Sequence, residues 1–168
     1  LPREERDIPI KYVGIALLVL TVPVFFIYND ILPTAQLSIL ITIIMMVFGF
    51  FFSAVAAYMA GVVGSSNNPI SGVTVATVLF ASLLLLAILG SGSLQGAAAA
   101  IMVGAVVCNA AAIGGDNLQD LKTGHLIGAT PWKQQVMQVV GVLSAAIVLG
   151  LVLDILHTAY TIGSPTLS

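Results

Sequence analysis

The stretch Leu37–Val63, LSILITIIMMVFGFFFSAVAAYMAGVV, contains no charged residue. A helix that crosses the hydrocarbon core of a bilayer needs roughly 20 mainly apolar residues, because the core is about 30 Å thick and each residue advances about 1.5 Å. This stretch is longer than that, so as a helix it must tilt, bend or project beyond the lipid. It predicts a membrane-spanning helix.

Four further apolar runs, residues 12–28, 73–89, 97–113 and 136–156, are long enough or nearly long enough to cross a bilayer. Of the 168 residues of the chain, 59% are hydrophobic and only 7% are charged, whereas soluble domains have about 25% charged residues. A surface this apolar must be covered by lipid. We therefore expect an all-α, polytopic integral membrane protein with about five transmembrane helices, in which residues 1–168 form part of one transmembrane domain.

The basic residues indicate how the chain is oriented in the membrane. Three of them precede the first span and two lie between the fourth and fifth spans: Arg3, Arg6, Lys11, Lys122 and Lys133. With five spans and a cytoplasmic start, both groups fall on the cytoplasmic side, where Lys and Arg are enriched. The loops expected on the other side, residues 29–36 and 90–96, contain no Lys or Arg. Tyr12 and Tyr28 flank the first span, as is typical of aromatic residues at membrane interfaces.

The connection between the second and third spans is unusually polar, with the sequence GSSNNPISGVT over residues 64–74. Pro69 cannot donate a backbone hydrogen bond and disfavours helical geometry at Asn68. One interpretation is a re-entrant or broken segment near Gly64–Gly72 that lines a cavity, because non-helical backbone at membrane depth requires protein or water around it. The alternative is an ordinary cytoplasmic turn in which a serine such as Ser71 caps the next helix.

A second polar signature, GGDNLQDLKTGHLIGATPWK, covers residues 114–133. If its first part is helical, Asp116 and Asp120 lie one turn apart on one face, and Gly124 continues that face. Two like charges so close together favour a nearby cation, proton or bulk water. The segment is therefore either a coupling site or gate at the cytoplasmic mouth, or a solvated interfacial helix whose charges, with Lys122, face water.

The remaining chemically active residues do not form a recognisable catalytic or metal site. Asp154 and His157 are expected as a hydrated pair near the outer end of the fifth span, although an acid inside a span is also a functional candidate. His125 lacks partner ligands for a metal, and Cys108 is the only cysteine. Because a nucleophile–base pair and a phosphate-binding loop are missing too, we expect neither an enzyme nor a cofactor. The net charge of −2 gives no reason to expect nucleic-acid binding.

Residues 64–74 and 115–131, preceded by ERDIPIK at residues 5–11, resemble the oligopeptide transporter superfamily, and in particular its prokaryotic branch, which is related to the yellow-stripe-like transporters of metal chelates. The resemblance covers essentially the whole chain, but members of the family are much longer, so the chain resembles only part of one. It implies a secondary active transporter in a bacterial or archaeal plasma membrane that couples a proton to symport of small peptides, peptide-like molecules or metal chelates. The partners it implies are the remaining helices of a full-length protein, with a homo-oligomer left open.

The resemblance also transfers candidate roles to residues of the two signatures. The candidates for lining the substrate path are Asn67, Asn68, Pro69, Ser71, Gly72 and Thr74. The candidates for coupling or gating are Asp116, Gln119, Asp120, Lys122, Thr123 and Gly124. The alternative to transport is a non-transporting membrane scaffold or a truncated remnant of a transporter.

Overall fold

The computed structural model describes residue 2 and residues 5–162, and this part of the chain forms five long α-helices and no strand. In order they are α1 (Ile10–Ile31), α2 (Ala35–Val63), α3 (Ile70–Leu89), α4 (Leu94–Leu126) and α5 (Pro131–Tyr160), with a 3₁₀ turn, η2 (Ser65–Asn67), between α2 and α3. All five helices are long and apolar enough to cross a bilayer. The predicted all-α, polytopic membrane fold is confirmed.

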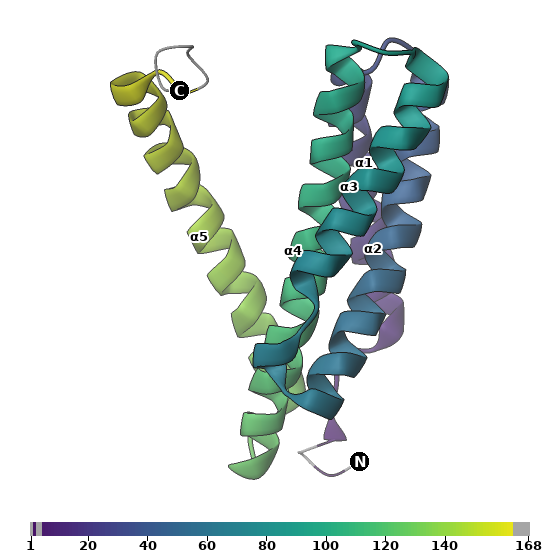
Figure 1. The fold of residues 1–168 in the computed structure, drawn as a ribbon. Helices are drawn as coiled ribbons and strands as arrows, with labels where there is room; N and C mark the ends of the chain where they lie inside the picture. Colours follow the sequence, from purple (N-terminus) through teal and green to yellow (C-terminus); the bar gives the residue numbers. More distant parts are fainter. Residues whose placement is uncertain (1, 3–4, 163–168) are drawn as a thin grey trace.

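Local sequence explains where several helices begin and end. Thr34 and Ser93 precede α2 and α4, and their hydroxyl oxygens accept hydrogen bonds from the backbone N–H of Leu37 and Gly96. Gly64 and Gly90 end α2 and α3 in the positive-φ region, at 92° and 79°, which glycine adopts without steric cost. Short turns then make consecutive helices antiparallel (Figure 1).

Helix α4 differs from the prediction in extent. The apolar run ends near residue 113, but the helix continues to Leu126 and takes in the whole acidic segment. The backbone hydrogen bonds of a helix do not depend on side-chain polarity, so polar residues with adequate helix propensity extend it. Residues 114–126 of the second signature are therefore the C-terminal part of α4, and residues 131–133 begin α5.

The core of the bundle lies between α2, α3 and α4. Its buried residues on α4 are small, with Ala99, Ala100, Val103 and Ala111 at 0–1% exposure. Gly104 lacks a side chain where Val78 of α3 approaches, and a methyl group there would overlap with it. Small residues that let helix backbones approach closely are the usual basis of packing inside membranes.

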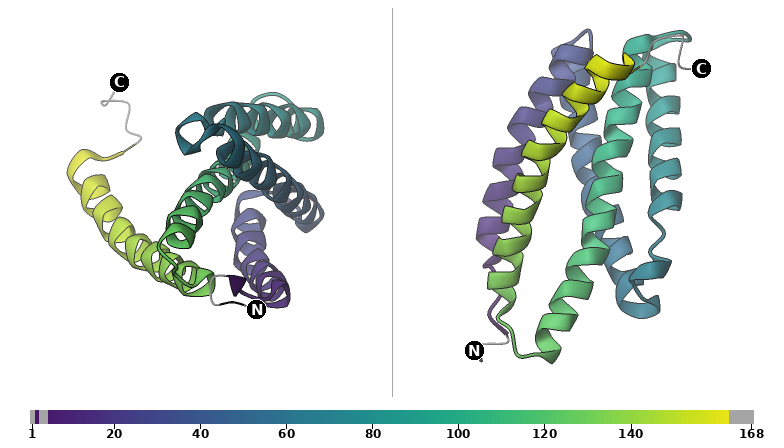
Figure 2. Two further views of the ribbon diagram at one scale, coloured as in Figure 1. Left: turned by 90° about the horizontal axis from the view of Figure 1, so that it is seen from below. Right: turned by 90° about the vertical axis from the view of Figure 1, so that its left-hand side faces the viewer.

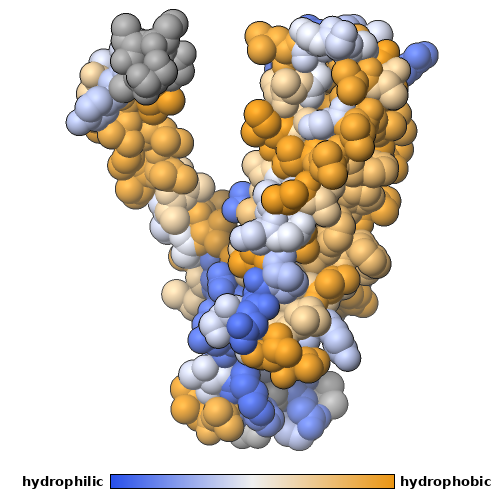
Figure 3. All heavy atoms as spheres, viewed as in Figure 1, coloured by the Kyte–Doolittle hydropathy of each residue, from blue (hydrophilic) through white to orange (hydrophobic). Residues whose placement is uncertain are grey.

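Two helices are peripheral. α5 contacts α4 near its start and then leans away from the bundle (Figures 1 and 2), and the helix contains no buried residue. On α1 only Tyr28 is buried. Its side chain is fully enclosed in the core. The surface of α5 beyond its first turns is strongly hydrophobic (Figure 3), and α1 exposes large hydrophobic residues such as Leu18 and Leu20, as lipid or neighbouring helices require.

Candidate functional site

Both polar signatures lie at the same end of the bundle. Antiparallel helices bring the turn between α2 and α3, the end of α4, the start of α5 and the N-terminal segment to the lower end in Figure 1. The first signature forms the 3₁₀ turn η2, and α3 begins at Ile70 directly after Pro69, without a side-chain cap. The predicted serine cap is therefore not formed, and the helical path is broken between Gly64 and Pro69.

Asn68 joins the two signatures. Its side-chain Nδ2 donates a hydrogen bond to the backbone carbonyl of Ala111 on α4, at 3.2 Å. One turn further on, Gly115 leaves room for this amide, and a methyl group at Gly115 would overlap with Nδ2 of Asn68. The side-chain oxygen of Asn68, Oδ1, is buried and has no hydrogen-bond partner among the described residues. An unpaired buried acceptor is costly in a protein interior, so it is a candidate contact for a ligand.

The other predicted path residues make local contacts. The amide of Asn67 is exposed and donates to the carbonyl of Val63 at 3.1 Å, at the end of its own helix. Thr74 donates to the carbonyl of Ile70 at 2.8 Å within α3. Pro69 is half-buried at the start of α3, whereas Ser71 and Gly72 are exposed. These residues lie at the same end of the bundle, but Asn68 is the one with a hydrogen bond to α4, and its side chain lies beside Gly115 of the second signature.

In the second signature, most of the predicted coupling or gating residues have exposed side chains. Exposed residues are Asp116, Gln119, Asp120, Lys122 and Thr123, whereas Gly124 is buried. The hydroxyl of Thr123 donates to the carbonyl of Gln119 at 3.0 Å within the helix. Asp120 and Gly124 face the start of α5, which agrees with the face predicted from their spacing.

Two glutamines on α5, which the sequence analysis did not single out, contact this face. Gln138 Nε2 donates to Oδ2 of Asp120 at 2.8 Å, and Gln134 Nε2 donates to the backbone carbonyl of Asp120 at 3.2 Å. Gly124 provides the space for the Gln134 side chain. We refer to Asp120, Gly124, Gln134 and Gln138 as the amide seam. Figure 3 shows hydrophilic residues gathered where α5 meets the bundle. The sequence feature that could have indicated these contacts is the pair Gln134 and Gln138, two amides one helical turn apart at the start of an apolar span.

The N-terminal segment is attached to the same end. Gln135 of α5 donates through Nε2 to Oδ1 of Asp7 at 3.2 Å and accepts from the backbone N–H of Ile8 at 3.3 Å. The backbone N–H of Trp132 donates to the carbonyl of Arg6 at 3.1 Å. The described basic residues thus gather at the end that carries both signatures, and Arg3 lies outside the described residues.

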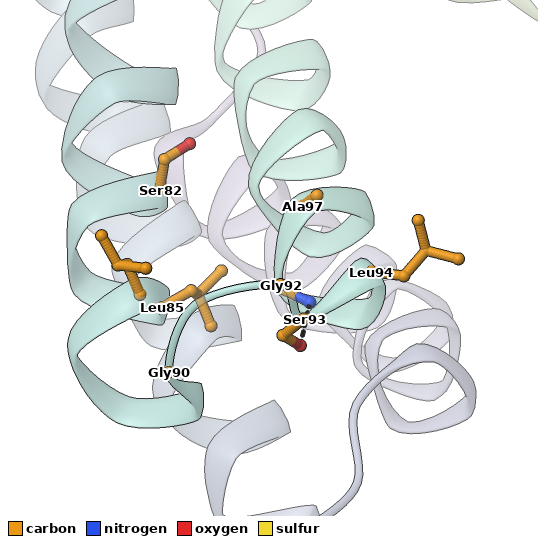
Figure 4. Close-up of a pocket in the computed structure, with 9 residues that line it drawn as sticks. Ser82, Leu85, Gly90, Gly92, Ser93, Leu94 and Ala97 are labelled. Carbon is orange, nitrogen blue, oxygen red and sulfur yellow. Dashed lines mark hydrogen bonds between the residues drawn. The ribbon is translucent and has the colours of Figure 1, made fainter.

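The opposite end of the bundle carries a different feature. A shallow pocket of about 420 Å³ lies at the turn between α3 and α4 and is lined by residues such as Ser82, Leu85, Gly90 and Ser93 (Figure 4). None of its lining residues belongs to either signature. Asp154 and His157 lie in the last turns of α5, and both are exposed. Within residues 5–162, no three His, Cys, Asp or Glu side chains are grouped as metal ligands.

Comparisons with known proteins identify relatives of the whole chain. The sequence model of the family described as "OPT oligopeptide transporter protein" matches residues 1–167. A curated protein of Haemophilus influenzae (strain ATCC 51907 / DSM 11121 / KW20 / Rd), described as "Putative oligopeptide transporter", is 40% identical over 158 residues. This match covers 87% of the chain but 25% of the relative, so the chain spans about a quarter of that relative's length. No solved structure matches the chain.

Proposed function

The chain belongs to the OPT oligopeptide transporter family, and from this premise we propose that it forms part of the transmembrane domain of a proton-coupled symporter of small peptides or peptide-like solutes, metal chelates included. The observation that carries the proposal is the meeting of two polar signatures at one end of an apolar bundle, where the side chain of Asn68 lies beside Gly115 and donates a hydrogen bond to Ala111 of the same helix. Polar residues are expensive at membrane depth and are retained chiefly where they line a path. The remaining helices of a full-length protein complete that path.

The chemistry of a peptide suits the groups at this end. A peptide presents amide N–H donors and an ammonium group, and the unpaired Oδ1 of Asn68, which is enclosed in this structure, can accept a hydrogen bond from such a donor once neighbouring side chains move apart. Asp116 and Asp120 are exposed carboxylates of the second signature that can accept the coupling proton. Protonation of a carboxylate beside the path changes the local charge, which is how proton relays in transporters are built.

Uptake by vesicles tests this function. We expect the intact native polypeptide, reconstituted in lipid vesicles, to accumulate radiolabelled tri-alanine when an inward proton gradient is imposed, and to lose accumulation when a protonophore dissipates the gradient. A parallel assay with an iron chelate distinguishes the two substrate classes. Vesicles that contain folded protein but accumulate neither solute with the gradient would favour the scaffold or remnant instead.

We also propose that the end bearing both signatures faces the cytoplasm of a bacterial or archaeal cell, because Arg6, Lys11, Lys122 and Lys133 lie there. Cys108 is the only cysteine of the chain, so a background for single-cysteine labelling needs Cys108→Ser together with replacement of any cysteines elsewhere in the full-length protein. In intact cells, a membrane-impermeant maleimide is expected to label Ser91→Cys, in the turn at the opposite end, and to spare Ser66→Cys. Labelling of Ser66→Cys alone would reverse the orientation.

A further inference from the structure

The attachment of α5 to the bundle is polar, which is unusual for a helix this apolar. From residue 139 to the end of α5 every side chain is exposed, so the helix contributes no buried residue to the core. Its contact with α4 is made near its start, where the two amides of the amide seam reach Asp120. Hydrogen bonds from Gln134 and Gln138 to Asp120 join the start of α5 to α4, and hydrogen bonds of Trp132 and Gln135 join it to the N-terminal segment.

The geometry points to Gln138 as a positioning residue for the Asp120 carboxylate during proton-coupled transport, an inference that rests on the proposed function. A free aspartate side chain on an exposed helix face samples several rotamers. The 2.8 Å hydrogen bond from Gln138 selects the one in which Oδ2 points toward α5. Hydrogen bonds to a charged acceptor are shorter and stronger than neutral ones, which favours this rotamer over the others.

Gln134 and Gly124 reinforce this arrangement. Gln134 binds the backbone carbonyl of the same residue, Asp120, and occupies the space left by the absent side chain of Gly124. The main chain and the side chain of Asp120 are therefore each held by a different amide, one turn apart on α5. Because both amides come from α5, any tilt of α5 against α4 moves the carboxylate or releases it. The seam thus links the position of one helix to the position of the candidate coupling group.

Gln135, which lies between Gln134 and Gln138 in the sequence, serves as a matched control. Gln135 has the same side chain on the same helix turn, but its amide contacts Asp7 and Ile8 of the N-terminal segment and not Asp120. Replacing Gln135 by leucine removes an amide from α5 without touching the seam. Replacing Gln138 by leucine removes a hydrogen bond to a charged group while keeping a side chain of similar size.

The test compares two activities of the intact native polypeptide in vesicles, with tri-alanine as the probe. Gradient-driven accumulation requires coupling, whereas exchange of labelled for unlabelled tri-alanine at equal pH requires only the substrate path. We expect Gln138→Leu to lower the initial rate of accumulation about tenfold or more, while exchange stays within about twofold of the wild-type rate. Gln135→Leu is expected to keep the wild-type rates of both accumulation and exchange.

Three outcomes are distinguishable. Accumulation by Gln138→Leu within twofold of wild type would overturn the positioning role and leave the transport function intact. Equal losses of accumulation and exchange would also overturn it, because they indicate a purely structural contribution to folding or packing. Wild-type protein that shows neither accumulation nor exchange would reject the proposed function, and with it this inference.

Discussion

Replacement of Asn68 by alanine is expected to lower the initial rate of tri-alanine uptake about a hundredfold. The substitution removes the interhelical hydrogen bond to Ala111, and such bonds contribute about 0.6–2 kcal/mol inside membranes. It also removes Oδ1, the buried acceptor that we assign to the substrate, and a hydrogen bond to a charged donor contributes about 1.5–3 kcal/mol. Only the lost substrate contact enters the uptake rate of the folded protein, and about 1.5–3 kcal/mol corresponds to a factor of roughly 10 to 150.

The control for this variant is Asn29→Ala. Asn29 is an exposed asparagine near the opposite end of the bundle, so its loss removes the same chemical group without affecting the signatures. Both proteins should be purified in equal yield and show one sharp peak on size exclusion before uptake is compared. An Asn68→Ala protein that is folded and transports at the rate of Asn29→Ala would remove Asn68 from the substrate path.

Gly115→Ala is expected to destabilise the protein by about 1–2 kcal/mol. The new methyl group occupies the position of Nδ2 of Asn68, so the amide must move and its bond to Ala111 is lost. Overpacking of this kind costs about 1–3 kcal/mol. Alanine is a better helix former than glycine by about 1 kcal/mol, which offsets part of the cost. The free energy of unfolding in detergent, obtained from a denaturant titration, measures the net effect.

Gly61→Ala is the comparison variant, for which we expect no loss in the free energy of unfolding. Gly61 lies on α2 and also faces α4, but a methyl group there meets only Cδ1 of Leu118 at 3.9 Å, an ordinary van der Waals distance. The gain in helix propensity then dominates, and we expect Gly61→Ala to be neutral or stabilising by up to about 1 kcal/mol. If Gly115→Ala proves as stable as Gly61→Ala, the close contact between Gly115 and Asn68 does not exist in the protein.

The sequence predicted the helices well because the bilayer imposes a simple requirement. A run of about 20 apolar residues has few alternatives to a spanning helix, and all five predicted runs lie within observed helices. The predicted ends were less accurate. In α4, polar residues after position 113 continue the same hydrogen-bonded ladder, so hydropathy marks where the apolar residues end and not where the helix does.

Contacts between helices were much harder to predict. The spacing of Asp120 and Gly124 correctly placed them on one face, but the sequence does not reveal that Gln134 and Gln138 of another helix bind there. Likewise, a tyrosine near the end of a span is typical of a membrane interface. The sequence does not reveal that Tyr28 is buried, because its burial depends on how α1 packs against its neighbours. Asn68 and Gly115 were each notable as members of a motif, and the three-dimensional structure shows that they form one contact.

The most direct test of the account is a double-mutant cycle between Asn68 and Gly115, measured as the free energy of unfolding of four proteins: wild type, Asn68→Ala, Gly115→Ala and the double variant. If Asn68 occupies the space beside Gly115, the methyl group of Gly115→Ala has nothing to displace once Asn68 is alanine. We predict that Gly115→Ala destabilises the wild-type protein but is neutral or stabilising in the Asn68→Ala background. Equal destabilisation in both backgrounds would contradict the claim that this contact joins the two signatures.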